Sequence, residues 1–307
     1  MSSTIEKALQ RQREAQQKKK AQEQEQSTIE ASQQKMASAM SERASVPPAQ
    51  STAAPGLASS LESFNLDLDR LEKNGHISMF GTRKKINEEY REIKRKLLNN
   101  AFGPLSSTLQ NSNIIMVTSG RPSEGKTFTA CNLAMSIAAE QDKTVLLVDA
   151  DVLKPNVLNT LGLEKRRGLI EYLTGEVEDI SDVLYPTNID KLKIIPAGKS
   201  HHLTTELLAS RKMAETVNEF ANRYSDRIVV FDTPPLIGIT ETAVLANFAG
   251  QAVVVVEEGK SKLSDIRHAV DRLNPDMAIG FVVNKSVYKD SDGTGYYGYY
   301  YSERQNS

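Results

Sequence analysis

Cysteine, net charge and long apolar runs are all scarce in this chain of 307 residues. The single cysteine, Cys131, cannot form an internal disulfide, which fits a reducing cytoplasm. The 38 basic and 39 acidic residues nearly cancel, so no overall field favours binding to nucleic acid. No apolar run approaches the roughly eighteen residues of a membrane span, and the start at Met1 lacks the apolar core of a signal peptide. We therefore expect a soluble, cytoplasmic protein that does not use nucleic acid as a partner.

Large apolar residues are also scarce in the first part of the chain. Residues 1–45 consist mainly of Gln, Lys, Glu, Ser and Ala, a composition that cannot build a core. Residues 46–60 are rich in Pro, Ser and Ala and are typical of a linker. We expect a polar, partly helical or disordered segment over 1–60, a folded domain over 61–285 and a flexible tail over 286–307. A short helix near Ile5 is either a solvated polar helix or a docking helix for a partner.

Beyond residue 61 the pattern becomes that of a folded domain. Helical spacing over 61–71 and 86–101 precedes short β-branched runs that alternate with amphipathic stretches. The predicted strands are 114–118, 145–148, 192–195, 228–231, 252–256 and 279–283, and the predicted helices between them are 127–139, 205–224, 240–248 and 264–273. Continuous apolar strands separated by helices predict an α/β fold, a mostly parallel central sheet with helices on both faces. Ligands of such sheets bind at the carboxyl ends of the strands.

Residues 120–127 have the pattern of a phosphate-binding loop, G-x-x-x-x-G-K-T. The loop follows a predicted strand and precedes a predicted helix, which is the context that this motif requires. Backbone N–H groups would face phosphate oxygens, Lys126 would add a positive charge, and the Thr127 hydroxyl would bind Mg²⁺. The alternative is a plain surface turn. The predicted nucleotide-binding residues are Gly120, Arg121, Pro122, Ser123, Glu124, Gly125, Lys126, Thr127 and Phe128.

Aspartates end two of the predicted strands. Strand 145–148 runs into Asp149 and Asp151, and strand 228–231 runs into Asp232. A turn or a helix cap would explain one such acid. Acids after two buried strands instead indicate a bound cation, which Mg²⁺ with ATP would supply. The three aspartates and Thr127 are thus the predicted metal ligands, and the aspartates with Lys126 are the predicted catalytic residues.

Together these motifs resemble the bacterial tyrosine kinases, relatives of the ParA and MinD ATPases. The pair Asp149 and Asp151 is similar to the Walker A′ motif of that family, Asp232 opens a match to its Walker B motif, and 118–127 match its P-loop. The resemblance covers residues 61–301 and is greatest to the separate cytoplasmic kinases of exopolysaccharide and exosortase systems. It implies an ATP-dependent tyrosine autokinase that regulates exopolysaccharide synthesis or export. It further implies a homo-oligomer, a membrane-spanning polysaccharide co-polymerase that recruits the chain to the inner face of the membrane, and a tyrosine phosphatase as partners.

Two positions depart from the patterns of that family. The family loop usually carries Gly where this chain has Ser123. The family pattern for oligomerisation, E-x-x-R-x-x-R, is represented here by Glu88, Arg91 and Lys94, and a lysine lacks the two-pronged guanidinium of arginine. The resemblance implies that these three residues form a subunit contact. The alternative is pairing within one helix, Glu88 with Arg91 and Glu92 with Arg95.

Five tyrosines crowd into the last twelve residues. They are Tyr296, Tyr297, Tyr299, Tyr300 and Tyr301, and they follow a polar stretch of turn residues with little reason to fold. Beside a P-loop enzyme, a tail of hydroxyls looks like its own substrate, and the resemblance implies the same. The alternative is an aromatic tail that packs on a partner. An extended chain from 288 to 301 reaches about 40 Å, which permits transfer between neighbouring subunits.

The expected reaction requires a base, because the pKa of tyrosine is about 10. Asp149 or Asp151 would take the proton, and the pattern does not distinguish them. The competing function is a ParA-like or MinD-like positioning ATPase, whose attacking group is water. Such proteins usually carry a signature lysine where this chain has Arg121, and they leave the tyrosines without a role. A third reading is a nucleotide-sensing adaptor without catalysis, against which the complete set of motif residues argues.

Overall fold

The computed structural model describes residues 62–79 and 84–286. Residues 1–61, 80–83 and 287–307 lie outside the described part, and so do the expected N-terminal helix and the five tyrosines of the tail. The expected domain boundaries near residues 60 and 286 therefore stay predictions.

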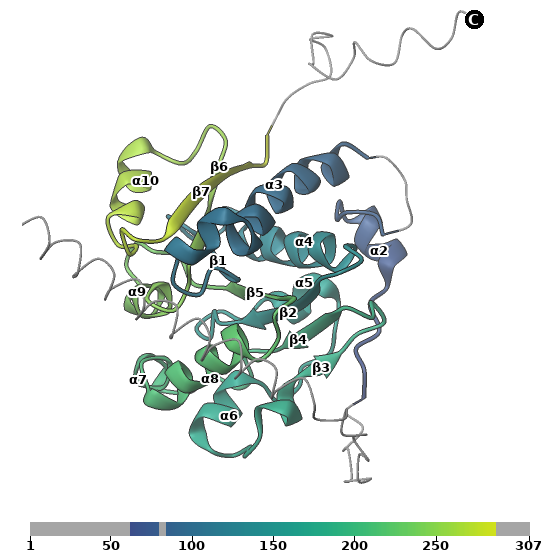
Figure 1. Cartoon of the computed structure of the whole chain (residues 1–307), viewed down its shortest axis with the longest axis vertical. Coiled ribbons are helices and arrows are strands. Elements are labelled where there is room, and N and C mark those ends of the chain that lie inside the picture. Colours follow the sequence, from purple (N-terminus) through teal and green to yellow (C-terminus); the bar gives the residue numbers. More distant parts are fainter. Residues whose placement is uncertain (1–61, 80–83, 287–307) are drawn as a thin grey trace, which may run out of the picture. The chain divides into compact units, whose positions relative to one another are not determined.

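A seven-stranded sheet organises the described residues, in the order β3-β4-β2-β5-β1-β6-β7 (Figure 1). Its neighbouring strands are parallel except for β3, which pairs antiparallel with β4. The mostly parallel sheet predicted from the sequence is confirmed. The strands are β1 Ile114–Ser119, β2 Thr144–Asp149, β3 Tyr185–Pro186, β4 Leu192–Ile195, β5 Arg227–Asp232, β6 Gln251–Glu257 and β7 Ala278–Asn284.

The central strands are apolar on both faces because helices cover both faces. Every residue of β1 and of β5 is buried. Helices α3 and α4 lie on one side of the sheet, and α8 and α9 lie on the other (Figure 1). The helices are α2 Leu68–Lys73, α3 Lys85–Phe102, α4 Lys126–Ala138, α5 Val157–Leu161, α6 Leu169–Thr174, α7 Thr204–Leu208, α8 Arg211–Asn222, α9 Thr240–Ala246 and α10 Leu263–Val270, with short 3-10 helices η1 Pro104–Thr108 and η2 Ile180–Val183.

Helix α3 is fastened to α4 by a buried lysine. The Lys94 ammonium donates to the Ser136 carbonyl oxygen at 2.9 Å and pairs with Glu140 Oε1 at 2.6 Å. Glu88 and Arg91 lie on the exposed side of α3 and pair with each other at 2.5 Å. Of the two pairs predicted within the helix, Glu88 with Arg91 is therefore present. The subunit contact stays a prediction, and in this fold Lys94 already binds inside its own chain.

Two predicted helices differ from the structure. The stretch 205–224 forms two helices, α7 and α8, because Ser210 ends the first and caps the second: its hydroxyl accepts the Met213 N–H at 3.2 Å. The stretch 61–71 is helical only from Leu68, because Phe64 adds a bridge beside Thr187 in the sheet region. The two-residue strand β3 was not predicted, since its Tyr-Pro sequence carries no strand periodicity.

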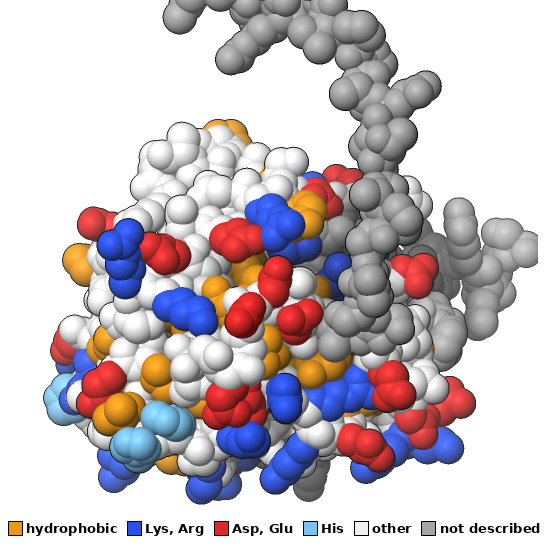
Figure 2. Space-filling view, turned by 90° about the horizontal axis from the view of Figure 1, so that it is seen from below, with side chains coloured by type: hydrophobic (Ala, Val, Ile, Leu, Met, Phe, Trp, Pro, Cys, Tyr) orange, Lys and Arg blue, Asp and Glu red, His pale blue; other side chains and the backbone are white. Residues whose placement is uncertain are grey.

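The surface carries mixed charge. Figure 2, seen from below Figure 1, shows Lys and Arg side chains interspersed with Asp and Glu, and no broad field of one sign among the coloured residues of that face. Within residues 62–79 and 84–286, no helix is both long and apolar enough to cross a bilayer.

The break between α7 and α8 yields a test of stability. Replacing Ser210 by Ala removes the hydroxyl that accepts the Met213 N–H, so we expect the free energy of unfolding to fall by about 1 kcal/mol. Ser210→Asp keeps an acceptor and should stay near wild type. Urea unfolding of the three proteins makes the comparison, and an alanine variant as stable as wild type would show that packing alone sets the break.

Candidate active site

The phosphate loop, residues 120–127, connects β1 to α4 at the carboxyl edge of the sheet. Gly125 immediately precedes the helix with a φ of 102°, in the left-handed region where glycine is favoured. A Cβ at this position would lie 1.9 Å from Asn284 Nδ2, so any other residue would displace that side chain. The strand, the loop and the helix are those predicted from the motif, which confirms the context of the phosphate-binding pattern.

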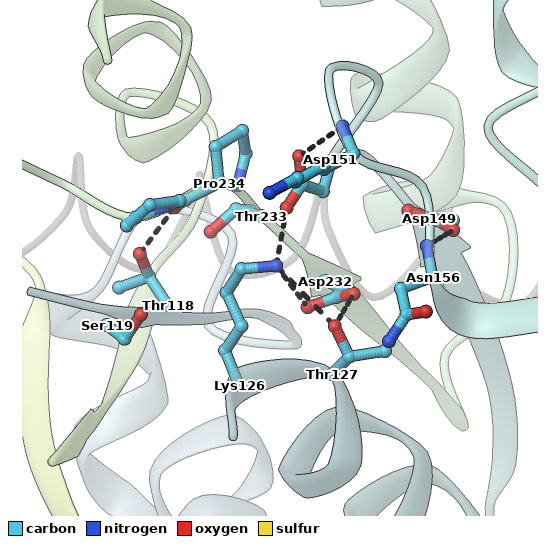
Figure 3. A network of polar contacts seen from close by, with 12 residues as sticks. Thr118, Ser119, Lys126, Thr127, Asp149, Asp151, Asn156, Asp232, Thr233 and Pro234 are labelled. Atoms are coloured by element: carbon cyan, nitrogen blue, oxygen red, sulfur yellow. Dashed lines mark hydrogen bonds and ion pairs between the residues drawn. The ribbon is translucent and has the colours of Figure 1, made fainter. Parts of the chain in front are cut away.

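Lys126 lies between two carboxylates. Its ammonium is 2.5 Å from Asp151 Oδ2 and 3.7 Å from Asp232 Oδ1 (Figure 3). The Thr127 hydroxyl donates to Asp232 Oδ2 at 2.7 Å. The lysine side chain is only 11% exposed and that of Asp232 is fully buried, so these charges interact with little screening by solvent.

Asp149 stands beside Asp232 because their strands are in register. The two residues are direct partners across β2 and β5, both at the ends of their strands. Asp149 Oδ2 accepts the N–H groups of Asn156 at 3.2 Å and Val157 at 3.0 Å, at the start of α5. Asp151 Oδ1 accepts the Lys154 N–H at 3.0 Å. The structure thus brings together all three predicted aspartates around the loop.

Burial shifts the ionisation of this cluster. It raises the pKa of Asp232 to about 6, although Lys126 and Thr127 oppose the shift. Burial, together with the neighbouring Asp232, also raises the pKa of Asp149 well above its ordinary value. For Lys126, burial acts to lower the pKa, but the attraction of Asp232 and Asp151 prevails and raises it. The lysine therefore keeps its charge near neutral pH.

Two aspartate oxygens remain available to a cation. Asp149 Oδ1 and Asp232 Oδ1 are buried and accept no hydrogen bond in the described structure, although Lys126 Nζ lies 3.7 Å from the Asp232 oxygen. Buried oxygens without a hydrogen bond are costly unless a donor or a cation approaches them more closely. No three His, Cys, Asp or Glu side chains among the described residues are arranged as a complete metal site. The donors fit Mg²⁺, which binds protein through one or two carboxylates and takes its other ligands from phosphate and water.

Several predicted nucleotide-binding side chains have partners within the protein. The Arg121 guanidinium forms two bonds to the carboxylate of Asp265, at 2.6 and 3.1 Å. Glu124 Oε2 accepts the Arg121 N–H at 2.8 Å, and Glu124 Oε1 accepts the Ser261 hydroxyl. Phe128 packs on the His76 ring, with centroids 4.6 Å apart. These side chains hold the loop, which leaves its backbone, Lys126 and Thr127 as groups that can face a phosphate.

Sequence reasoning missed residues that support the loop from far along the chain. Asp265 lies in α10 and Ser261 just before it, while Asn284 ends the last strand, Lys285 follows it, and both donate to loop carbonyl groups. The rule that identified Asp149 and Asp232, polar residues at the carboxyl ends of parallel strands, also applies to Asn284. No sequence pattern indicated Asp265 or Ser261.

A phosphate loop flanked by aspartates from neighbouring parallel strands defines the class of the P-loop ATPases. Comparison with known proteins agrees: the AAA domain family matches residues 112–277. Tyrosine-protein kinase YwqD of Bacillus subtilis is 30% identical over 231 residues, 75% of this chain and 93% of that protein. Tyrosine-protein kinase wzc of Salmonella typhimurium is 31% identical over 196 residues, 64% of this chain but only 27% of that protein.

The fold has solved counterparts. The crystal structure of the chimerical protein CapA2B2 superposes with a TM-score of 0.60 at 26% identity, covering 67% of this chain and 88% of the other. The chain belongs to the bacterial tyrosine-protein kinases, whose family was expected from the motifs.

The raised pKa of Asp232 yields a test in buffer without metal or nucleotide. Between about pH 4 and pH 6 the folded protein holds a proton that the unfolded chain releases, so the free energy of unfolding should fall as pH rises through this window. Asp232→Asn removes the cost of the buried charge. We expect this variant to be more stable than wild type above pH 6, by about 1–3 kcal/mol, and similar near pH 4.

Urea unfolding at a series of pH values measures this difference. Asp142→Asn is the matched control, because that carboxylate is exposed, pairs with Lys143 and has a lowered pKa. It should give no such gain at neutral pH. An Asp232→Asn protein that is less stable than wild type at pH 7 would show that the attraction of Lys126 outweighs the cost of burial.

Proposed function

We propose that this chain transfers the γ-phosphate of ATP to the tyrosines 296, 297, 299, 300 and 301 of its own C-terminal segment, between the subunits of a homo-oligomer. The observation that carries the proposal is the convergence of Lys126, Thr127 and three strand-end aspartates on one phosphate loop. Family membership and the tyrosine cluster support the same reaction.

The phosphate loop and Lys126 would bind the phosphates. In the protein alone, the ammonium pairs with Asp151 at 2.5 Å, so an arriving phosphate competes for it. When a phosphate replaces Asp151 as the partner of the ammonium, Lys126 stays charged and one oxygen of Asp151 becomes available. Phosphoryl transfer has a loose transition state, so fixed positive charge and accurate placement contribute more than covalent chemistry.

The aspartates have separate environments that suit separate roles. Thr127 and Asp232 would hold Mg²⁺, directly or through water, and Asp149 would contribute its available oxygen. The ion would neutralise charge on the phosphate oxygens. Asp149 and Asp151 are the groups that would orient the tyrosine hydroxyl and take its proton. Asp149 is held in place by two backbone N–H groups, while Asp151 is the acid that a phosphate would free from Lys126.

The tyrosines would come from a neighbouring subunit. The described chain ends at Ser286, and the acceptors begin ten residues later, at Tyr296. An extended segment of that kind reaches about 30 Å or more, enough to meet an adjacent site. Glu88 and Arg91 lie exposed on α3 and are the predicted contacts between subunits, with Lys94 behind them. Phosphates on several tyrosines would repel one another and weaken the assembly.

The cellular setting follows from the resemblance to exopolysaccharide kinases. We infer that the phosphorylation state of the tail regulates polysaccharide synthesis or export through a membrane-spanning co-polymerase at the inner face of the membrane, with a tyrosine phosphatase as the opposing enzyme. The alternative function, a positioning ATPase, receives no support from Arg121. Its guanidinium, at the position of the signature lysine, is instead paired with Asp265.

The kinase proposal predicts phosphate on residues 296–301 when the purified full chain is incubated with Mg²⁺ and ATP. Lys126→Met should reduce the reaction by about a hundredfold or more, because the positive charge that would face the phosphates is lost. Lys143→Met is the matched control, since Lys143 lies at the opposite end of β2 and should not matter. Phosphopeptide mass spectrometry reads the result. ATP hydrolysis without phosphotyrosine would favour the positioning ATPase.

Transfer between subunits is tested by mixing two chains. The Lys126→Met full-length chain supplies acceptors, and an otherwise intact chain lacking residues 296–307 supplies the active site. We expect phosphate on the inactive full-length chain, at a rate that rises with the concentration of the truncated chain. If the mixture remains unphosphorylated while wild type is modified, transfer occurs within one chain.

A further inference from the structure

The end of the last strand touches the phosphate loop. Asn284, the final residue of β7, donates through Nδ2 to the Glu124 carbonyl oxygen at 2.9 Å. Lys285, the next residue, donates through Nζ to the Ser123 carbonyl oxygen at 2.7 Å. These contacts join segments about 160 residues apart. They reach two successive carbonyl groups in the loop, directly before Gly125 and Lys126.

The lysine contact occurs where the backbone is strained. Asn111, Ser123 and Lys285 are the described non-glycine residues with positive φ, at 51°, 70° and 57°. Asparagine tolerates this left-handed region better than most residues. Serine and lysine have no such tolerance, so positive φ costs them conformational energy. Ser123 and Lys285 therefore share both an unfavourable conformation and a direct hydrogen bond. Strain of this kind persists only where surrounding contacts impose it, and it is concentrated at functional sites.

The lysine is itself held in place. Lys285 Nζ lies 2.9 Å from Glu257 Oε2, so the carboxylate at the end of β6 directs the ammonium toward the loop. Glu257 also pairs with Lys260 through Oε1, at 2.5 Å. The Lys285 side chain is 45% exposed, so replacing it opens no cavity in the core.

We propose that Asn284 and Lys285 are positioning residues that hold the phosphate loop in its nucleotide-binding conformation, with Lys285 stabilising the left-handed backbone of Ser123. The inference rests on the proposed binding of nucleotide at this loop. Neither side chain needs to touch the phosphates, because each acts through a loop carbonyl group. By fixing these carbonyl groups, they also fix the direction of the N–H groups that follow.

The position of these two residues in the chain gives the contact a second consequence. Lys285 lies two residues before the segment 287–307, which carries the five predicted acceptor tyrosines. The phosphate loop is therefore in direct contact with a residue that lies two positions before that segment. A ligand that orders the phosphate loop would therefore also order the end of β7. Because such coupling is reciprocal, ordering the end of β7 would in turn favour binding at the loop.

The first test measures the affinity of the full-length protein for ADP by titration calorimetry. Lys285→Met should weaken ADP binding about three- to tenfold, the effect of one lost hydrogen bond to a charged donor. Lys285→Arg keeps a donor and should restore most of the affinity. Lys260→Met is the matched control, because it removes the other partner of Glu257 while leaving the described contact with Ser123.

The Ser123→Gly variant provides the experiment that decides whether Lys285 acts through Ser123. Ser123→Gly removes the strain that Lys285 offsets, since glycine adopts positive φ without cost. In the Ser123→Gly background, Lys285→Met should therefore change the affinity for ADP less than twofold. Equal losses in both backgrounds would overturn the role assigned to Lys285 at Ser123. Wild-type protein that binds no ADP would instead overturn the proposed nucleotide site.

The second test follows hydrogen exchange at the end of β7. In wild type, ADP should slow exchange of the backbone amides of residues 283–286, and in Lys285→Met this protection should be lost even at saturating ADP. Kinase assays should show the loss mainly as a raised KM for ATP, with kcat nearly retained. Protection by ADP that is the same in both proteins would show that Lys285 merely forms a surface ion pair with Glu257.

Discussion

Charge concentrated at the buried carboxyl edge of a parallel sheet is the constraint on which this structure depends. Asp149 and Asp232 are neighbours because β2 and β5 run in register, and Lys126 reaches across the loop to Asp232 and Asp151. Carboxylates so close together in a medium of low dielectric repel each other and lose hydration. The lysine, the Thr127 hydroxyl and the backbone N–H groups at the start of α5 offset part of that cost. What remains is an affinity for positive charge, which is the property that a site for metal-bound nucleotide requires.

The loop above these acids is held by contacts that have no part in the chemistry. Glu124 accepts from Arg121 and Ser261, Asp265 holds the Arg121 side chain, and the end of β7 donates to loop carbonyl groups. These bonds order the loop, so a nucleotide would not have to bear the cost of ordering it. They also make the loop dependent on β6, α10 and β7, elements that precede the tyrosine-bearing end of the chain. Asn284 and Lys285, the last described residues to contact the loop, lie just before the segment that carries the proposed acceptors.

Much of the framework could be predicted from local patterns. Buried parallel strands are continuous apolar runs, so six of the strands could be predicted from their Val and Ile content. The phosphate loop could be predicted from its glycines and lysine. The misjudged stretches were those where a tertiary contact or a single capping group overrides periodicity. Ser210 divides one amphipathic stretch into two helices, and Phe64 leaves a helical pattern to join the sheet region. Lys94 matched a pattern expected at a subunit surface, yet it lies against α4 because its long side chain can reach the Ser136 carbonyl group.

By itself the sequence determined the phosphate loop and the acids that follow two strands, because each is encoded within a few neighbouring residues, and it determined the fold class through the alternation of strand and helix patterns along the chain. Only the tertiary structure decided that β1 lies between β5 and β6, that Asp149 faces Asp232, and that Lys285 meets Ser123. Strand order and register place residues more than 80 positions apart within hydrogen-bonding distance. They result from the burial of whole faces of the sheet, a property of the assembled core that no short segment carries.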